Sequence, residues 1–95
     1  MRSHYENLAE HYFRFAIRYP CWDMIENQSG QELWEAARNV LEDLPDEDVV
    51  FLKKVFSRQY ANPQAGIMAY GGNRYKLQKR LVEIYELYAK QAGLI

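Results

Sequence analysis

Cysteine and long apolar runs are what this sequence most conspicuously lacks. Cys21 is the only cysteine among 95 residues, which excludes an internal disulfide and a thiolate metal cluster. No window approaches the roughly 18 apolar residues of a membrane-spanning helix, and no apolar signal-peptide core follows Met1. The sequence therefore predicts a cytoplasmic protein that is neither exported nor inserted in a membrane.

The patterns of common catalytic and cofactor sites are also missing. No glycine-rich phosphate loop leads into a lysine, and no strand pattern precedes Gly71 and Gly72. Cys21 has no predicted basic partner to activate it as a nucleophile. His4 and His11 are seven residues apart, on one face of a helix, but a metal site would need a third ligand from elsewhere. We therefore expect no enzymatic activity, no metal and no cofactor.

Helical periodicity, by contrast, runs through most of the chain. Apolar residues recur three and four apart in residues 5–17, 33–44, 52–60 and 77–92, whereas the alternating pattern of a strand is absent. Asn62 and Asn73 are suited to cap a short helix and the last helix. The pattern predicts an all-α fold for residues 1–95, a single domain formed by a compact bundle of five to six helices.

Serine and proline indicate where further helices begin. Ser3 and Ser29 each precede a glutamate by three residues, which is the spacing of a capping box. Pro45 suits the first turn of a helix because its ring fixes φ and it lacks an N–H. The segment around Cys21 and Trp22 is expected to form one short helical turn.

The charges are distributed unevenly along the chain. Residues 1–48 contain four arginines and eleven acids, a net charge of −7, and residues 49–95 contain eight bases and two acids, a net charge of +6. Such asymmetry is typical of nucleic-acid contact or of an acidic interaction surface. It is equally consistent with the two halves attracting each other in the folded protein.

Residues 46–90 are predicted to form a helix, a short helix, a glycine turn and a long helix. This order resembles the helix-turn-helix of DNA-binding proteins. In that motif the turn glycine, here Gly71, lets the second helix cross the first steeply, and the opening residues of the second helix enter the major groove. The sequence departs from the motif at Ile67, where a small residue is expected, and at Arg80, where an apolar residue is commoner. The resemblance implies a C-terminal trihelical unit and a nucleic-acid-binding set of Asn73, Arg74, Lys76, Gln78, Lys79 and Arg80.

The cations at the start of the last helix carry an electrostatic cost. Each of the four opposes the helix dipole by about 0.3–1 kcal/mol, and Lys76 and Arg80 repel each other at i and i+4. The phosphates of a nucleic acid would balance them, and so would the acids of the N-terminal half. The first possibility predicts a regulatory protein, monomer or homodimer, that binds nucleic acid, with DNA preferred to RNA. Whether Tyr75 is a core or a contact residue is open from sequence alone.

The acidic half supports an alternative function. Its carboxylates are expected to line the outside of the second long helix and the turn after it, a surface suited to a basic protein partner. In size and charge the chain resembles small acidic inhibitors encoded by phages and other mobile elements. This resemblance implies a protein–protein inhibitor or adaptor without a membrane partner. The candidate protein-binding residues are Glu42, Asp43, Asp46, Glu47 and Asp48.

Overall fold

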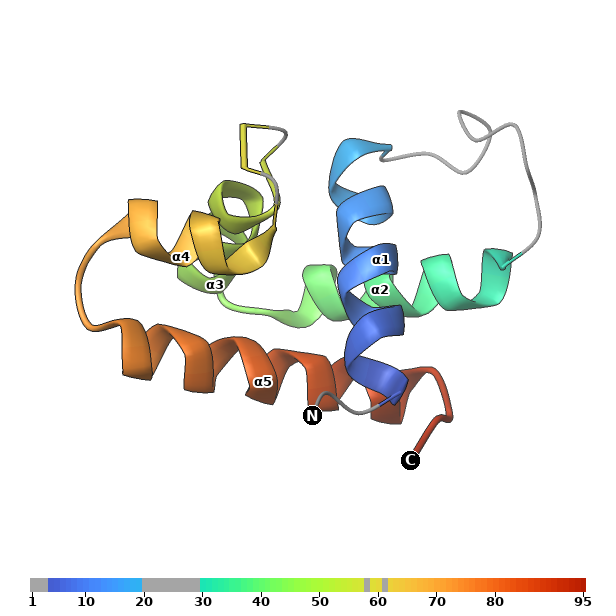
Figure 1. The fold of residues 1–95 in the computed structure, drawn as a ribbon. Coiled ribbons are helices and arrows are strands. Elements are labelled where there is room, and N and C mark those ends of the chain that lie inside the picture. Colours follow the sequence, from blue (N-terminus) through green and yellow to red (C-terminus); the bar gives the residue numbers. More distant parts are fainter. Residues whose placement is uncertain (1–3, 20–29, 58, 61) are drawn as a thin grey trace.

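The structure is a computed structural model that describes residues 4–19, 30–57, 59–60 and 62–95, and those residues form five α-helices and no strand (Figure 1). The all-α prediction is thereby confirmed. Ser3, Ser29 and the segment around Cys21 and Trp22 lie outside the described residues. The helices are α1 (His4–Arg18), α2 (Gln31–Asp43), α3 (Asp46–Val55), α4 (Pro63–Tyr70) and α5 (Arg74–Gln91).

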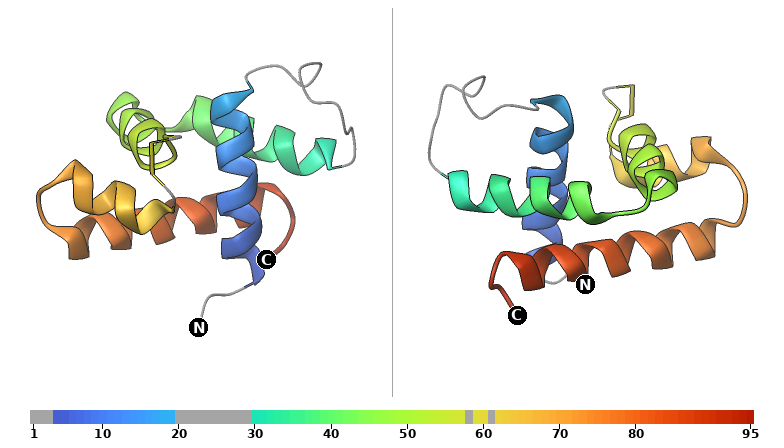
Figure 2. Two further views of the ribbon diagram at one scale, coloured as in Figure 1. Left: turned by 45° about the horizontal axis from the view of Figure 1, so that its top comes forward. Right: turned by 180° about the vertical axis from the view of Figure 1, so that it is seen from behind.

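The last helix, α5, runs along one side of the bundle, beneath α2, α3 and α4 in Figure 1, and the N-terminal end of α1 reaches down to its level. It packs against α1, α2 and α4, and α4 packs in turn on α3. Both views in Figure 2 show α1 and α2 near the C-terminal end of α5, and α3 and α4 near its N-terminal end. The Cα radius of gyration is 12.7 Å, close to the roughly 12 Å of a compact chain of this length. The two ends of the bundle are therefore joined through α5.

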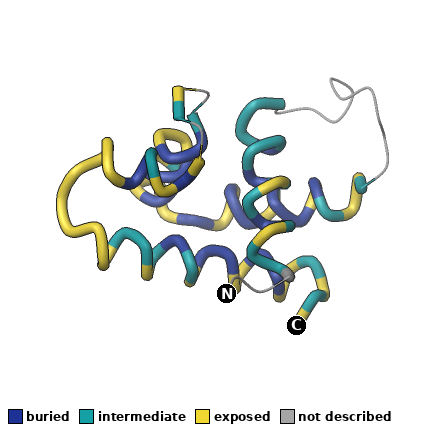
Figure 3. The backbone as a smooth tube through the Cα atoms, in the orientation of Figure 1, coloured by how far each residue is buried: buried dark blue, intermediate teal, exposed yellow. Residues whose placement is uncertain are grey.

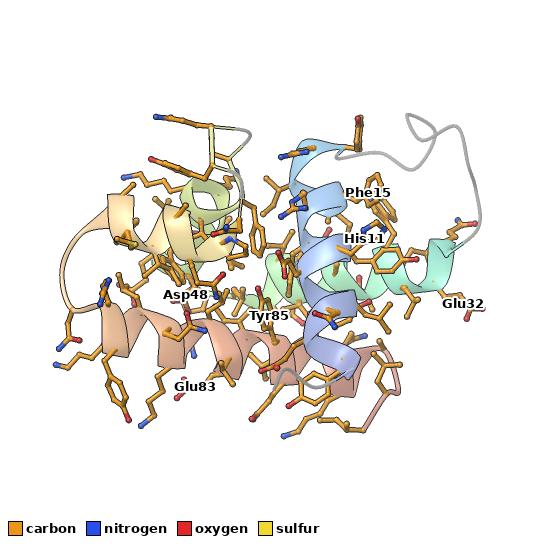
Figure 4. The ribbon with its side chains drawn as sticks, in the orientation of Figure 1. His11, Phe15, Glu32, Asp48, Glu83 and Tyr85 are labelled. Carbon is orange, nitrogen blue, oxygen red and sulfur yellow. The ribbon has the colours of Figure 1, made fainter. Side chains whose placement is uncertain are left out.

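Phe13 of α1 lies where these helices meet, and it is fully buried. Its ring centroid is 6.4 Å from that of Phe56, which directly follows α3, and 6.3 and 5.5 Å from those of Tyr85 and Tyr88 in α5. The buried segments, dark blue in Figure 3, gather at this centre, and Figure 4 shows Tyr85 rising from α5 toward it. Burial, with a smaller contribution from Tyr12, raises the pKa of Tyr88 well above its ordinary value. The Tyr88 phenol is therefore a neutral core group.

Two asparagines set the starts of the C-terminal helices. The Asn62 Oδ1 accepts a hydrogen bond from the Ala65 N–H at 2.9 Å, and the Asn73 Oδ1 accepts one from the Lys76 N–H at 3.2 Å. Each bond satisfies one of the backbone donors that a helix leaves unpaired in its first turn. Both predicted caps are confirmed.

The start of α2 differs from the capping box predicted at Ser29. The N-cap is Gly30, with φ +85° and no side-chain cap hydrogen bond. A Cβ at Gly30 would overlap the Tyr12 hydroxyl of α1. Glycine therefore serves twice here, because it adopts the left-handed conformation readily and leaves room for α1.

Gly66 in α4 marks the closest approach between α4 and α3. A Cβ at this position would lie 2.6 Å from the Val55 carbonyl oxygen and 2.8 Å from the Val55 Cα. These are backbone atoms, which cannot move aside as the end of a side chain can. The glycine in the middle of α4 is therefore explained by packing, although it weakens the helix by roughly 1 kcal/mol relative to alanine.

We predict that Gly66→Ala destabilises the protein by about 1–3 kcal/mol, as overpacking does elsewhere. Helix propensity alone predicts the opposite sign, a gain of roughly 1 kcal/mol. Thermal and urea denaturation followed by circular dichroism measure the difference. Ala69→Gly, at an exposed position of the same helix, gives the size of the propensity effect without the packing contact. A stabilised Gly66→Ala variant would show that α3 and α4 do not approach this closely.

Candidate nucleic-acid interface

The turn between α4 and α5 and the first residues of α5 form the longest exposed stretch among the described residues. Residues 68–76 are all exposed, and they appear as continuous yellow at one end of the bundle in Figure 3. A Cβ added at Gly71 or Gly72 would meet nothing within 4 Å. The start of α5 is therefore accessible to a large partner.

Three of the predicted cations remain exposed at this end of α5. They are Arg74, Lys76 and Lys79, and no carboxylate of the described part of the chain forms an ion pair with any of them. Positive charge near a helix N-terminus is unfavourable by about 0.3–1 kcal/mol when unscreened. Within the described residues, this cost is not offset by a direct ion pair.

Arg80, the fourth predicted cation, is instead held by Asp48 at the start of α3. The Arg80 Nε donates to Asp48 Oδ1 at 3.2 Å, a second guanidinium nitrogen donates to Asp48 Oδ2, and a third donates to Glu83 Oε2 at 3.1 Å. In Figure 4, Asp48 lies on the α3 side of α5 and Glu83 on the opposite side. The hydrogen bonds with Asp48, opposed by partial burial, raise the pKa of Arg80. Arg80 is thus bound by two carboxylates of the protein itself, although its side chain is 36% exposed.

The same pair changes the acidic candidate surface. Asp48 is only 9% exposed, so it lies in the interior rather than on the predicted docking surface. A buried carboxylate is costly unless it is paired and hydrogen-bonded, and the forked guanidinium of Arg80 provides both. One residue from each predicted binding set is therefore used to join α3 to α5.

The remaining acidic candidates are exposed around the junction of α2 and α3. They are Glu42, Asp43, Asp46 and Glu47. Glu42 lies 4.0 Å from Arg38 one turn earlier in α2, a surface pair of the kind that contributes less than about 1 kcal/mol. This corner of the molecule thus presents four carboxylates to solvent.

Tyr75 and Gln78 take up different positions beside the cations. Tyr75 is 78% exposed, so it is a surface residue and not part of the core. Gln78 is half-buried and lines a groove of about 180 Å³ between α4 and α5, together with Gln64, Ile67, Met68 and Arg74. Asn73 is exposed, but its carbonyl oxygen is used to cap α5. The sequence alone did not place Tyr75, because an aromatic residue between cations is compatible with a core position as well as a surface position.

The arrangement of α4 and α5 bears on the helix-turn-helix resemblance. In both Figure 1 and Figure 2 the two helices lie side by side and run in broadly opposite directions. Two antiparallel helices joined by a short loop form a helical hairpin, whereas the DNA-binding motif crosses more steeply. The helix-turn-helix unit stays a prediction.

Other kinds of site find little support in the described residues. No group of three or more His, Cys, Asp and Glu side chains among them is placed to hold a metal ion. The exposed His11 contacts the rings of Tyr12 and Phe15 edge-on, at 4.9 and 4.6 Å between centroids. None of the helices described has the length and apolar character needed to cross a membrane.

Neither the family models, the curated proteins nor the solved structures with which the chain was compared match it. The function must therefore be inferred from its own residues.

We predict that Arg80→Ala lowers the free energy of unfolding by about 1–2 kcal/mol. The substitution leaves the Asp48 carboxylate buried without its partner. The effect stays this small because the Arg80 side chain is partly exposed to solvent, which weakens the ion pair. For a domain of this size each kcal/mol corresponds to roughly 4–8 °C in melting temperature. Lys76→Ala is the matched control, since this exposed cation lies one turn away without an ion pair, and its change should stay within about 0.5 kcal/mol. Thermal denaturation of both variants provides the measurement. Equal melting temperatures would show that the Asp48 pair adds no stability.

Proposed function

We propose that this protein is a small, non-enzymatic regulator that binds nucleic acid through the exposed cations at the start of α5. The observation that carries the proposal is the grouping of Arg74, Lys76 and Lys79 without an ion pair in the described part of the chain. Phosphate groups would offset the unfavourable position of these cations near the helix N-terminus. The proposed protein acts in the cytoplasm as a monomer or homodimer, without a cofactor or a membrane partner.

The division of charge along α5 limits where a phosphate backbone can lie. Glu83 and Glu86 are exposed and follow the cations within two turns, so a strand running along the whole helix would meet carboxylates. Contact is therefore confined to the first turns, as it is when a recognition helix enters a groove by its N-terminal end. This geometry supports a short footprint at one end of the bundle.

The two amide residues near the cations, Gln78 and Asn73, differ in which of their atoms are available to bind a base. Gln78 lines the groove between α4 and α5 and is half-buried, and glutamine can bind adenine in a bidentate manner. Asn73 has its amide nitrogen left for a base, because its oxygen is used by the cap. DNA remains the preferred partner over RNA under the helix-turn-helix interpretation, in which these residues face the major groove. Arg80 is not part of the proposed contact set.

We predict that binding to random-sequence DNA weakens steeply as salt is raised. Three phosphate contacts correspond to a log–log slope of about −2.7 for duplex DNA and about −2.1 for single strands, so Lys76→Ala and Lys79→Ala should each reduce the slope by about 0.7–0.9. Fluorescence anisotropy over a range of salt concentrations measures the slope, with RNA of the same length as a second ligand.

The matched control is Lys90→Ala, which removes an exposed lysine from the last turn of the same helix. It changes the net charge by the same amount but should leave the slope unaltered, because Lys90 is far from the cation group along α5. No salt-dependent binding to DNA or RNA at low ionic strength would overturn the proposal. An equal effect of all three substitutions would reduce it to non-specific attraction by net charge.

The second candidate function, an inhibitor or adaptor for a basic protein, is favoured by one observation at the acidic corner. Val50 is 47% exposed and lies three and four residues after Glu47 and Asp46 on α3. An exposed apolar side chain therefore lies beside carboxylates on the same face of the helix. Interfaces commonly combine an apolar centre with a polar rim.

We predict that replacing Glu42, Asp43 and Glu47 with lysine preserves helicity, because all three side chains are exposed. Under the adaptor hypothesis the same variant loses binding to a basic protein partner. Under the nucleic-acid hypothesis it binds DNA at least as tightly as the wild type, because long-range repulsion of phosphates is removed. Circular dichroism and the DNA titration described above distinguish these outcomes, and a weaker affinity for DNA would place the acidic corner in the nucleic-acid site.

A further inference from the structure

Tyr75 is the most exposed large hydrophobic side chain in the described part of the chain, at 78%. It stands between Arg74 and Lys76 in sequence and one turn before Lys79, so cations surround it on α5. An aromatic ring left in water gives up the free energy that burial would provide. Its exposure, by itself, is common for a tyrosine, but its position among cations without ion pairs is the feature that calls for a partner.

Tyr70 offers a contrast within the same exposed region. It is 40% exposed, its ring packs edge-on against Phe51 with centroids 5.3 Å apart, and Lys54 Nζ lies 5.3 Å from its centroid. Among the described residues, no aromatic ring or cation makes a comparable contact with Tyr75. Of these two exposed tyrosines, the ring of Tyr75 is therefore the one left available to an external group.

We propose that Tyr75 stacks on an unpaired base of a single-stranded nucleic acid while Arg74, Lys76 and Lys79 hold the neighbouring phosphates. This inference rests on the proposed binding of nucleic acid by these cations, but it replaces the duplex groove of the helix-turn-helix interpretation with strands whose base faces are accessible. Stacking on an aromatic side chain beside a cationic surface is the usual way in which single strands are bound without strong sequence preference.

The geometry favours a single strand over a duplex for two reasons. In a duplex the base faces are covered by their neighbours, so a groove offers Tyr75 only base edges, whereas an unpaired base offers its whole face. The cations from Arg74 to Lys79 also extend over only about 7.5 Å of helix, at about 1.5 Å per residue, before Glu83 follows. This short contact suits a few nucleotides of one strand better than the two backbones that flank a groove.

The experiment compares two ligands with equal phosphates. One is an oligothymidine strand and the other is a strand of the same length that carries abasic sites in place of every base. Wild type should bind the strand with bases at least about fivefold tighter, since stacking on one aromatic ring is worth a factor of this size or more. Tyr75→Ala should remove that preference, and Tyr75→Phe should retain it. An oligouridine strand and a hairpin duplex serve as further ligands, to separate RNA from DNA and single from double strands.

The variants are suited to this comparison because Tyr75 is largely exposed, so neither substitution removes a core contact. Circular dichroism confirms the fold, and Lys79→Ala should weaken both strands alike. Equal affinity of the wild type for the two strands would overturn the stacking proposal while leaving the proposed function standing. So would tighter binding to the hairpin duplex, or an unchanged preference in Tyr75→Ala. Failure to bind any strand at low salt would instead overturn the proposed function itself.

Discussion

The packing of Phe13 against Phe56, Tyr85 and Tyr88 is the contact on which the rest of the structure depends. It joins α1, the end of α3 and α5 at one fully buried point. Aromatic pairs at such separations contribute about 0.5–1.5 kcal/mol each beyond the burial of their area, a large share of the marginal stability of a small domain. Because these contacts anchor the C-terminal half of α5, its N-terminal half can pack against α4 and leave its first turn exposed to solvent.

The pair between Asp48 and Arg80 decides how the opposite charges of the two halves are used. Within the described part of the chain, the two halves form a direct ion pair here, where the carboxylate is buried and the guanidinium is forked around it. It does not extend to Arg74, Lys76 and Lys79, for which the described residues provide no ion pair. Among the described residues, the opposite charges of the two halves are thus paired internally at Asp48 and Arg80, and Arg74, Lys76 and Lys79 remain on the surface.

Local patterns in the sequence predicted the helices and the caps at Asn62 and Asn73, because periodicity and capping act within a few residues. The features that were not predicted depend on contacts between segments far apart. Arg80 and Asp48 are separated by 32 residues, so nothing near either one identifies the other. Gly66 is adjacent to Val55 only once α4 lies on α3, and the contact of Gly30 with Tyr12 likewise forms only once α1 packs beside α2.

The surface residues set the limit of what the sequence can say about the site. The sequence left Tyr75 open between core and surface, and only the fold shows that no neighbouring helix covers it. Within the residues that the structure describes, the same fold pairs Arg80 with carboxylates and leaves Arg74, Lys76 and Lys79 without an ion pair. An internal pair stabilises the bundle whether or not a ligand is present, whereas an unpaired cation beside a helix N-terminus lowers its free energy only when an anion arrives. The pairing of Arg80 therefore assigns this cation to the bundle, whereas Arg74, Lys76 and Lys79, which form no ion pair with the described residues, leave their charge to solvent or to an external anion.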